Sequence, residues 1–158
     1  MLFRSIGDKR WTDTYKRELL DSRILSTTLL ARTMAAMDSP PPVLLSASAT
    51  GFYGDRGDQV LTEASAPGSG FLAEICTEWE AATEPASSAG VRVAHLRTGI
   101  VLSRDGGALT KMLPLFKLGL GGKMGNGRAY WSWISLEDEI GAIRFLLDHA
   151  VSGPVNLT

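Results

Sequence analysis

Three glycines follow an apolar run in the middle of the chain, and their spacing could serve phosphate binding. The stretch reads LLSASATGFYGDRGDQVL from Leu44 to Leu61 and carries a G-x-x-G-x-x-G pattern. A dinucleotide fingerprint needs a helix that opens at its last glycine, because the first amides of that helix meet the pyrophosphate. After Gly57 the chain soon reaches Pro67 and two further glycines, and no apolar stripe forms. We therefore predict a turn here and no phosphate-binding helix.

Hydroxyl side chains lie at the end of the same apolar run. Ser48 and Thr50 close the predicted strand, and Tyr53 follows a few residues later. Ligands of open α/β sheets bind at the carboxyl ends of the strands, where a hydroxyl can hold or pass a proton. We take these three residues as candidate catalytic groups. For Tyr53 the structural alternative is packing beneath the loop that follows the strand.

Composition excludes several classes of function. The 158 residues suit one domain, and a formal net charge of −1 with scattered Lys and Arg gives no basic patch for a nucleic acid. A single Cys allows no internal disulfide and fits a reducing, cytoplasmic setting, while two His and one Cys supply a zinc site poorly. No apolar run approaches the roughly 20 residues of a membrane span. We expect a small-molecule substrate, no metal, no nucleic acid and no membrane; the oligomeric state is left open.

Helical and extended segments alternate along the chain. Apolar periodicity, Pro and Gly predict helices at 12–37, 71–84, 108–118 and 136–149, and strands or extended segments at 43–48, 90–102, 130–134 and 153–158. Strands separated by helices predict βαβ units and a largely parallel sheet. Thr12 is the expected N-cap of the first helix. The expected inward faces are Leu20, Ile24, Ala31 and Ala35 in the first helix, and Ile140, Ile143, Leu146 and Leu147 in the last.

Six blocks agree, in order and spacing, with a known family. SASATGFYG resembles a strand end of the form Ser-Ser-Ala-x-x-Tyr-Gly, and FLAEICTEWEAA is similar to the helix that follows it. VRVAHLRTGIVL, GNGRAYWSWISLEDEIGAI and GPVNLT resemble the segments that follow in short-chain dehydrogenase/reductases. The six blocks that narrow the resemblance to the atypical group called epimerase family proteins are IGDKRWT, DSRILSTTLL, SASATGFYGDRGD, FLAEICTEWEAA, LRTGIVLSRDGGALTKMLPLFKLGLGG and WSWI. The resemblance runs over 6–158. MLFRS, at 1–5, does not match and is expected to be a start from outside the family.

The resemblance implies an α/β, partial Rossmann-like fold, a doubly wound and mainly parallel sheet with flanking helices. It implies that 6–158 is the central and substrate-side part of an NAD(P)-binding domain. The family's N-terminal glycine-rich strand–turn–helix precedes the matched region, and in relatives the diphosphate lies on that helix. We therefore expect these residues alone to bind NAD(P) poorly or not at all, and to be inactive by themselves.

The implied function is NAD(P)-dependent hydride transfer at a carbinol or carbonyl carbon, by an epimerase or oxidoreductase. The substrate is not identified; a nucleotide sugar is the implied class, and NADP is favoured over NAD. The family's catalytic Tyr-x-x-x-Lys pair is absent, because Leu72 and Cys76 occupy its two positions. The alternative is a catalytically silent sensor or scaffold that binds the cofactor. For Cys76 we expect a small buried thiol.

The resemblance also places residues against the cofactor and the substrate. On the cofactor side these are Arg23, Ser46, Ala47, Arg97, Thr98 and Gly99, and on the substrate side Lys111, Arg128 and Trp131. Arg23 could instead form a surface ion pair with Asp21 or Asp55. Arg97 could instead brace the loop after the first strand. For Lys111 and Arg128 a solvated surface role is equally open, and packing is the alternative for Trp131.

Overall fold

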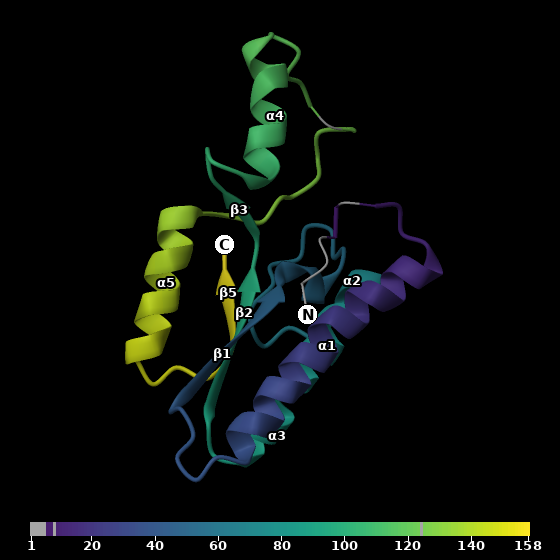
Figure 1. Cartoon of the computed structure of the whole chain (residues 1–158). Coiled ribbons are helices and arrows are strands. Elements are labelled where there is room, and N and C mark those ends of the chain that lie inside the picture. The colour runs from purple at the N-terminus through teal and green to yellow at the C-terminus, as the bar shows by residue number, and fades with distance from the viewer. Residues whose placement is uncertain (1–5, 8, 124) are drawn as a thin grey trace.

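The computed structural model describes residues 6–7, 9–123 and 125–158, so the start at 1–5 that was expected to differ from the family lies outside the described residues. Its elements follow the alternation expected from the sequence (Figure 1). In chain order they are α1 (Asp13–Ala35), β1 (Val43–Ala49), the 3-10 helix η1 (Thr50–Tyr53), α2 (Phe71–Ala81), α3 (Glu84–Ser88), β2 (Arg92–Thr98), β3 (Ile100–Leu102), α4 (Gly107–Lys117), β4 (Trp133–Ser135), α5 (Leu136–Asp148) and β5 (Gly153–Leu157).

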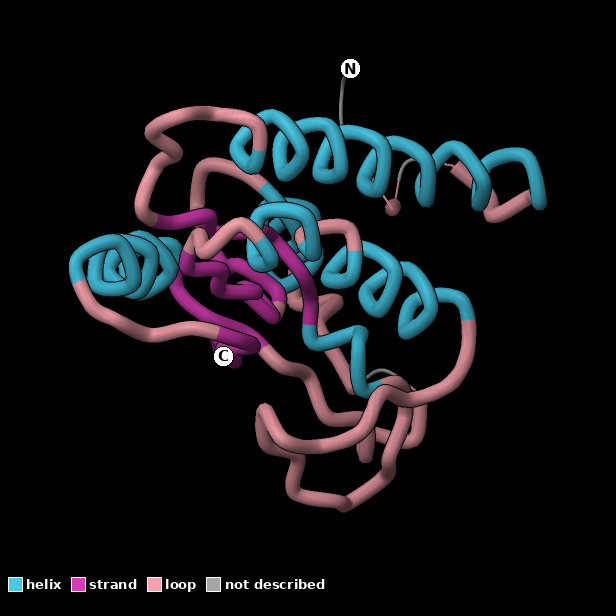
Figure 2. Tube along the Cα trace, turned by 90° about the horizontal axis from the view of Figure 1, so that it is seen from below, coloured by secondary structure: helices cyan, strands magenta, loops and turns pink. Residues whose placement is uncertain are grey.

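The strands form two small sheets, and every pairing in them is parallel. The main sheet has the order β1-β2-β5, and the second sheet pairs β3 with β4. Helices α1, α2 and α3 lie on one side of the main sheet and α5 lies on the other (Figures 1 and 2). This confirms the predicted α/β class with a parallel, doubly wound sheet.

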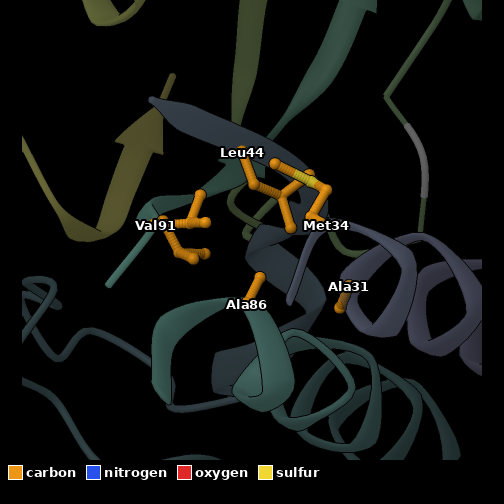
Figure 3. Packing of buried hydrophobic residues seen from close by; sticks show 6 residues of the cluster. Ala31, Met34, Leu44, Ala86 and Val91 are labelled. Carbon is orange, nitrogen blue, oxygen red and sulfur yellow. The ribbon is translucent and has the colours of Figure 1, made fainter. Parts of the chain in front are cut away.

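Apolar side chains are buried on both faces of the main sheet. One cluster joins α1, β1, α3 and β2 and consists of Ala31, Met34, Leu44, Ala86, Val91 and Val93 (Figure 3). A second cluster lies against α5 and consists of Leu96, Ile134, Leu146 and Leu157. Truncating one of these large side chains to Ala would cost about 2–5 kcal/mol, since transfer and cavity terms add.

Local capping fixes where the helices begin. The Thr12 hydroxyl accepts a hydrogen bond from the Tyr15 amide (3.2 Å), as the sequence predicted. Ser135 accepts from the Asp138 amide (3.0 Å) and donates to the Asp138 carboxylate (2.8 Å). Asp138 thus braces the first turn of α5 and fixes the direction in which that helix leaves β4.

The inward faces of two helices differ from the prediction. In α1 the buried face includes Tyr15, Leu19 and Met34, while Leu20 and Ile24 are only half-buried. In α5 Leu146 is buried, but Ile140 and Leu147 are about half exposed, at 48% and 49%. The main sheet has only three strands and covers a narrower stripe of α1 and α5 than their full apolar periodicity would fill. Periodicity alone therefore could not predict how each helix is rotated about its own axis.

The segment between η1 and α2 is irregular, as predicted. The next α-helix after Gly57 begins only at Phe71, so no helix opens at the third glycine. The segment folds back on η1: the Gly68 amide donates to the Phe52 carbonyl (2.9 Å), and a Cβ on Gly68 would collide with the Tyr53 carbonyl group. Only glycine allows this close approach.

Each helix in the described part of the chain is too short or too polar to span a membrane. Among the same residues, no group of three or more His, Cys, Asp or Glu side chains could hold a metal ion.

Candidate functional site

The carboxyl ends of β1 and β2 bring three predicted site residues together. Ser48 pairs in register with Arg97 on the neighbouring strand, and Tyr53 ends η1 directly after β1. Asn156 on β5 pairs with Arg97 from the other side. Parallel strands end at one edge of a sheet, so residues far apart in sequence meet there. We call Ser48, Tyr53, Glu80, Arg97 and Asn156 the carboxyl-edge network.

Glu80 of α2 is the centre of this network. The Ser48 hydroxyl donates to Glu80 Oε1 (2.6 Å). The Arg97 guanidinium donates Nε to Oε1 and Nη2 to Oε2, both at 2.9 Å. The two side chains are only 11% and 5% exposed, so this is a buried bidentate ion pair.

Arg97 also holds the loop that follows β1. Its Nη1 donates to the Tyr53 hydroxyl (2.9 Å) and to the Glu63 carbonyl (3.2 Å), and its guanidinium carbon lies 3.5 Å from the centre of the Phe52 ring. Tyr53 in turn donates to Asn156 Oδ1 (2.6 Å). Of the two roles predicted for Arg97, the structure supports bracing of this loop.

The charges of the network stabilise one another. Burial by itself would raise the pKa of Glu80, but hydrogen bonds from Arg97 and Ser48 outweigh burial and hold that pKa below its usual value. Burial by itself would lower the pKa of Arg97, but the hydrogen bonds to Glu80 outweigh burial and raise that pKa above its usual value. Both groups are therefore charged at neutral pH.

His95 of β2 lies beside the ion pair. Its Nε2 is 2.9 Å from the Thr83 hydroxyl, and its Nδ1 is 4.0 Å from Glu80 Oε2. Burial lowers the pKa of His95. The nearby negative charge of Glu80 acts in the opposite direction but only partly offsets the effect of burial. The imidazole is therefore neutral at pH 7, and the net charge of the site comes from Glu80 and Arg97.

The positions that the resemblance assigns to the catalytic Tyr and Lys lie against η1. A Cβ on Gly51 would be 3.5 Å from Leu72 Cβ and 3.8 Å from Cys76 Sγ. Leu72 is 37% exposed, and Cys76 is a buried free thiol, as predicted. Burial raises the pKa of the Cys76 thiol, so it stays protonated. Neither residue supplies a cation or an acidic hydroxyl.

The arrangement favours positioning over proton transfer by the buried hydroxyls. Glu80 has a lowered pKa and is a weak proton acceptor, so it orients Ser48 rather than taking its proton. The Tyr53 proton is directed at Asn156, and Ser48 and Tyr53 are both buried. Thr50 is only half-buried and is the predicted catalytic hydroxyl that solvent reaches.

The end of β2 lies against the start of α5. The Thr98 hydroxyl donates to Glu139 Oε1 (3.0 Å), and the Gly99 amide donates to the Leu157 carbonyl (2.9 Å). A Cβ on Gly99 would come within 2.8 Å of the Ser132 carbonyl, so the close approach of that backbone requires glycine. Glu139 Oε2 is buried and has no hydrogen-bond partner among the described residues.

The other residues predicted on the cofactor side differ in how deeply they are buried. Ser46 is buried on the same face of β1 as Ser48, while Ala47 faces the opposite way and is exposed. Arg23 is buried in α1, 5.2 Å from the Trp79 ring, and donates to the Leu19 carbonyl (3.0 Å). Burial lowers its pKa. The surface ion pair considered for Arg23 is therefore wrong, because its side chain is not on the surface; its contact with a cofactor stays a prediction.

The substrate-side residues are not part of the network. Lys111 lies on α4 and Arg128 on the segment that follows, and both are exposed. Trp131 is 47% exposed and does not pack as the alternative required. We call residues 103–132 the arm; in Figure 1 its helix α4 projects beyond the sheets. The three residues predicted to contact the substrate thus lie on the arm and make no part of the carboxyl-edge network, which contains Ser48 and Tyr53.

Sequence reasoning missed Glu80, Asn156 and Glu139. A usable signal existed for Glu80, because Cys76 lies one helical turn before it and is on the buried face of α2. A carboxylate on such a face needs a cation, and Arg97 on the neighbouring strand supplies it. Asn156 is the one amide in a short apolar strand. For Glu139 the sequence offers no signal that separates it from its acidic neighbours.

These features define a Rossmann-like domain with its polar groups at the carboxyl edge, and the chain belongs to the NAD-dependent epimerase/dehydratase family. The family model matches residues 1–157, a range that includes the start at 1–5 that was expected to come from outside the family. An epimerase family protein of Mycobacterium bovis is 48% identical over 155 residues, which are 98% of this chain and 51% of that protein. The chloroplastic SDR39U1 homologue of Arabidopsis thaliana is 38% identical over 152 residues, 94% of this chain and 44% of that protein.

Two solved structures are similar in fold and in sequence. Human epimerase family protein SDR39U1 (isoform 2), solved with NADPH, has a TM-score of 0.92 at 32% identity, covering 99% of this chain and 54% of that one. The nucleoside-diphosphate sugar epimerase of Corynebacterium glutamicum has a TM-score of 0.83 at 45% identity, covering 94% and 32%. The chain thus spans about half the length of the curated relatives it matches.

Proposed function

We propose that this chain contributes the nicotinamide and substrate side of an NAD(P)-dependent epimerase or oxidoreductase that acts on a nucleotide sugar, with NADP preferred to NAD. One observation carries the proposal: Ser48, Tyr53 and Arg97 meet at the carboxyl edge of a parallel sheet. The NADPH-bound human relative and the sugar-nucleotide epimerase from Corynebacterium support the cofactor and the substrate class.

The residues at this edge fit a nicotinamide cofactor. Ala47 is small and exposed, Thr98 and Gly99 are half-buried at the end of β2, and Glu139 Oε2 is a buried acceptor that no described residue satisfies. Ala47, Thr98 and Gly99 would hold the cofactor, with Ser46 beneath them. When bound, the cofactor would exchange a hydride with a carbinol or carbonyl carbon.

The chain's own groups would orient the substrate. Thr50 would hydrogen-bond the reacting oxygen, while Glu80 and Arg97 hold Ser48 and the loop that follows β1 in place. Lys111 and Arg128 would meet phosphate groups, as cations beside glycine-rich backbone, and Trp131 would cover the sugar. These contacts require the arm to lie over the carboxyl edge when substrate binds.

The residues at the positions of the catalytic Tyr and Lys favour a second candidate function. Leu72 and the protonated Cys76 stand beside Gly51 where the resemblance expects the catalytic Tyr and Lys. A Thr or Ser hydroxyl without a neighbouring cation is a poor proton donor or acceptor at neutral pH. The alternative is therefore a protein that binds NADPH as a sensor or scaffold and turns nothing over.

Calorimetric titration with NADPH and NADH, with the human relative as a positive control, tests the cofactor. We expect the chain to bind NADPH weakly, with a dissociation constant of about 1 mM (about −4 kcal/mol) and more tightly than NADH. Incubation with a panel of nucleoside-diphosphate sugars then separates the two functions. It uses a chimera in which this chain replaces the 155 matched residues of the Mycobacterium bovis relative, because the chain alone is expected to be inactive. Epimer formation that falls in Thr50→Val and persists in Thr77→Val supports an enzyme, because Thr77 lies on the exposed side of α2. Binding of NADPH by the chimera without any product supports the sensor, and absence of NADPH binding by the chimera overturns both functions.

A further inference from the structure

Three consecutive acidic residues open α5, and only one of them turns inward. Glu137 and Asp138 are exposed, and Asp138 takes part in the cap. Glu139 is partly buried, with Oε1 bonded to the Thr98 hydroxyl (3.0 Å). Its Oε2 is buried and has no hydrogen-bond partner in the described part of the chain.

An unpartnered buried carboxylate oxygen is costly, and most buried polar atoms in native proteins have a partner. Thr98 has a single hydroxyl proton, and its acceptors are Oε1 (3.0 Å) and, at a longer distance, the Leu96 carbonyl (3.3 Å), so no proton remains for Oε2. The neighbouring Gly99 uses its amide for the Leu157 carbonyl, so it has no donor to offer. Oε2 therefore retains acceptor capacity for an N–H or O–H group from outside the described chain.

We infer that Glu139 is a ligand-recognition residue that accepts a hydrogen bond from the nicotinamide half of the cofactor. This inference rests on the proposed function and adds a residue that the sequence did not single out. Thr98 holds Oε1, which orients Oε2 at the carboxyl end of β2, where ligands of such sheets bind. The donor is a neutral group, either the carboxamide NH2 or a ribose hydroxyl, because a carboxylate accepts from both.

Two mononucleotides distinguish these donors. Nicotinamide mononucleotide carries the carboxamide, whereas nicotinic acid mononucleotide replaces it with a carboxylate that Glu139 would repel; the ribose is the same in both. Ligand-observed NMR measures such weak binding to the whole chain. We expect the wild type to prefer the amide by about tenfold, as the loss of one charge-assisted hydrogen bond implies.

The variant Glu139→Gln keeps an oxygen for Thr98 and puts an NH2 group in place of Oε2. It should abolish or reverse the preference, while the matched control Glu137→Gln, which removes an exposed charge from the same turn, should retain it. If Glu139→Gln weakens both mononucleotides equally, the donor is the ribose hydroxyl. If it changes neither, or if neither mononucleotide binds, the inference is overturned; only when NADPH also fails to bind does the proposed function fall with it.

Thermal unfolding without ligand gives an independent reading. Because Glu139→Gln removes a partly buried charge and keeps an oxygen for Thr98, the ligand-free variant should unfold at the same temperature as the wild type or higher. A midpoint clearly below that of Glu137→Gln would show that Oε2 already has a structural partner, and would overturn the inference.

Discussion

The carboxyl-edge network and the arm carry cations of the same kind in opposite settings. In the network Arg97 is 5% exposed and donates to Glu80, Tyr53 and a loop carbonyl. In the arm Lys111 and Arg128 are exposed, their side chains make no hydrogen bond or ion pair with any residue that the structure describes, and no residue of α4 is buried. A cation in the first setting is part of the folded core, whereas one in the second is free to meet a ligand.

The largest effect should come from Arg97→Gln, because it leaves the Glu80 carboxylate buried without its cation. We expect a loss of about 3–5 kcal/mol in the free energy of unfolding, measured by urea denaturation. Arg128→Gln is the control in the arm. If Arg97→Gln does not fold, the double variant that combines Arg97→Met with Glu80→Leu should recover folding, since both charges are then removed. A loss under about 1 kcal/mol for Arg97→Gln would contradict the comparison.

Gly99 joins β2 of the main sheet to β3, which leads into the arm. Gly99→Ala tests the close backbone packing at this junction. The new Cβ would lie 2.8 Å from the Ser132 carbonyl carbon and oxygen and 3.0 Å from the Trp133 amide, so backbone must shift. We expect a loss of about 1–3 kcal/mol in denaturation experiments. The matched change Gly141→Ala in α5 meets nothing within 4 Å and should instead gain about 0.5–1 kcal/mol of helix stability. Equal effects of the two changes would refute the packing argument.

Tyr53→Phe removes the hydroxyl that joins Arg97 to Asn156. The Asn156 oxygen then loses its donor in a partly buried place, so we expect a loss of about 1–2 kcal/mol at unchanged denaturant slope. Tyr130→Phe, at a 77% exposed position in the arm, should stay within about 0.5 kcal/mol. A larger effect at Tyr130 than at Tyr53 would mean that the arm, and not the network, is the ordered region.

Acidification should weaken the network through His95. The folded pKa of His95 lies below its unfolded value of about 6.5, so the unfolded chain binds more protons below that pH. The stabilisation is therefore complete above about pH 6.5 and is lost as the pH falls through the folded pKa, at no more than about 1.4 kcal/mol per pH unit. Unfolding measured from about pH 7.5 to 5 should show this slope in the wild type and in His149→Gln. His95→Gln should flatten it, and an unchanged slope would remove His95 from the account.

The smallest effects belong to the arm. Lys111→Gln and Arg128→Gln should change the free energy of unfolding by no more than about 0.5 kcal/mol, since neither side chain loses a partner. Under the proposed function, the same changes should lower the binding of a nucleoside-diphosphate sugar, measured by calorimetry. A loss of more than about 1 kcal/mol in the free energy of unfolding would show that these side chains hold the arm in the folded structure, and would contradict the comparison.

The sequence carried the alternation of helices and strands, the parallel pairing and the position of Ser48, Tyr53 and Arg97, because strand ends in such sheets converge. It did not show that the strand predicted at 90–102 divides into β2 and β3 of separate sheets, or that α3 is a separate helix. It could not give the partner of Arg97. Glu80 shares the buried face of α2 with Cys76, but its contact with two strands depends on how that helix is rotated over the sheet. Rotation is set by packing volumes on both sides, and periodicity does not determine it.

The arm shows a different limit. Lys111, Arg128 and Trp131 were grouped by the resemblance, yet the chain between them is rich in glycine and little of it packs. Without buried contacts, nothing in the local sequence sets the distance from such residues to the sheet. Glu139 was invisible for a third reason, since only the three-dimensional environment separates it from Glu137 and Asp138.

The bond between Tyr53 and Asn156 spans 103 positions of the chain. Contacts of such long separation form late, because a large loop must first be closed at an entropic cost. During synthesis β5 emerges after β1, α2 and β2, so Arg97 and Glu80 can pair early while Tyr53 waits for β5. The burial of Tyr53 should thus be a marker of completed folding, and chains stalled before β5 should leave residues 54–70 open to proteolysis.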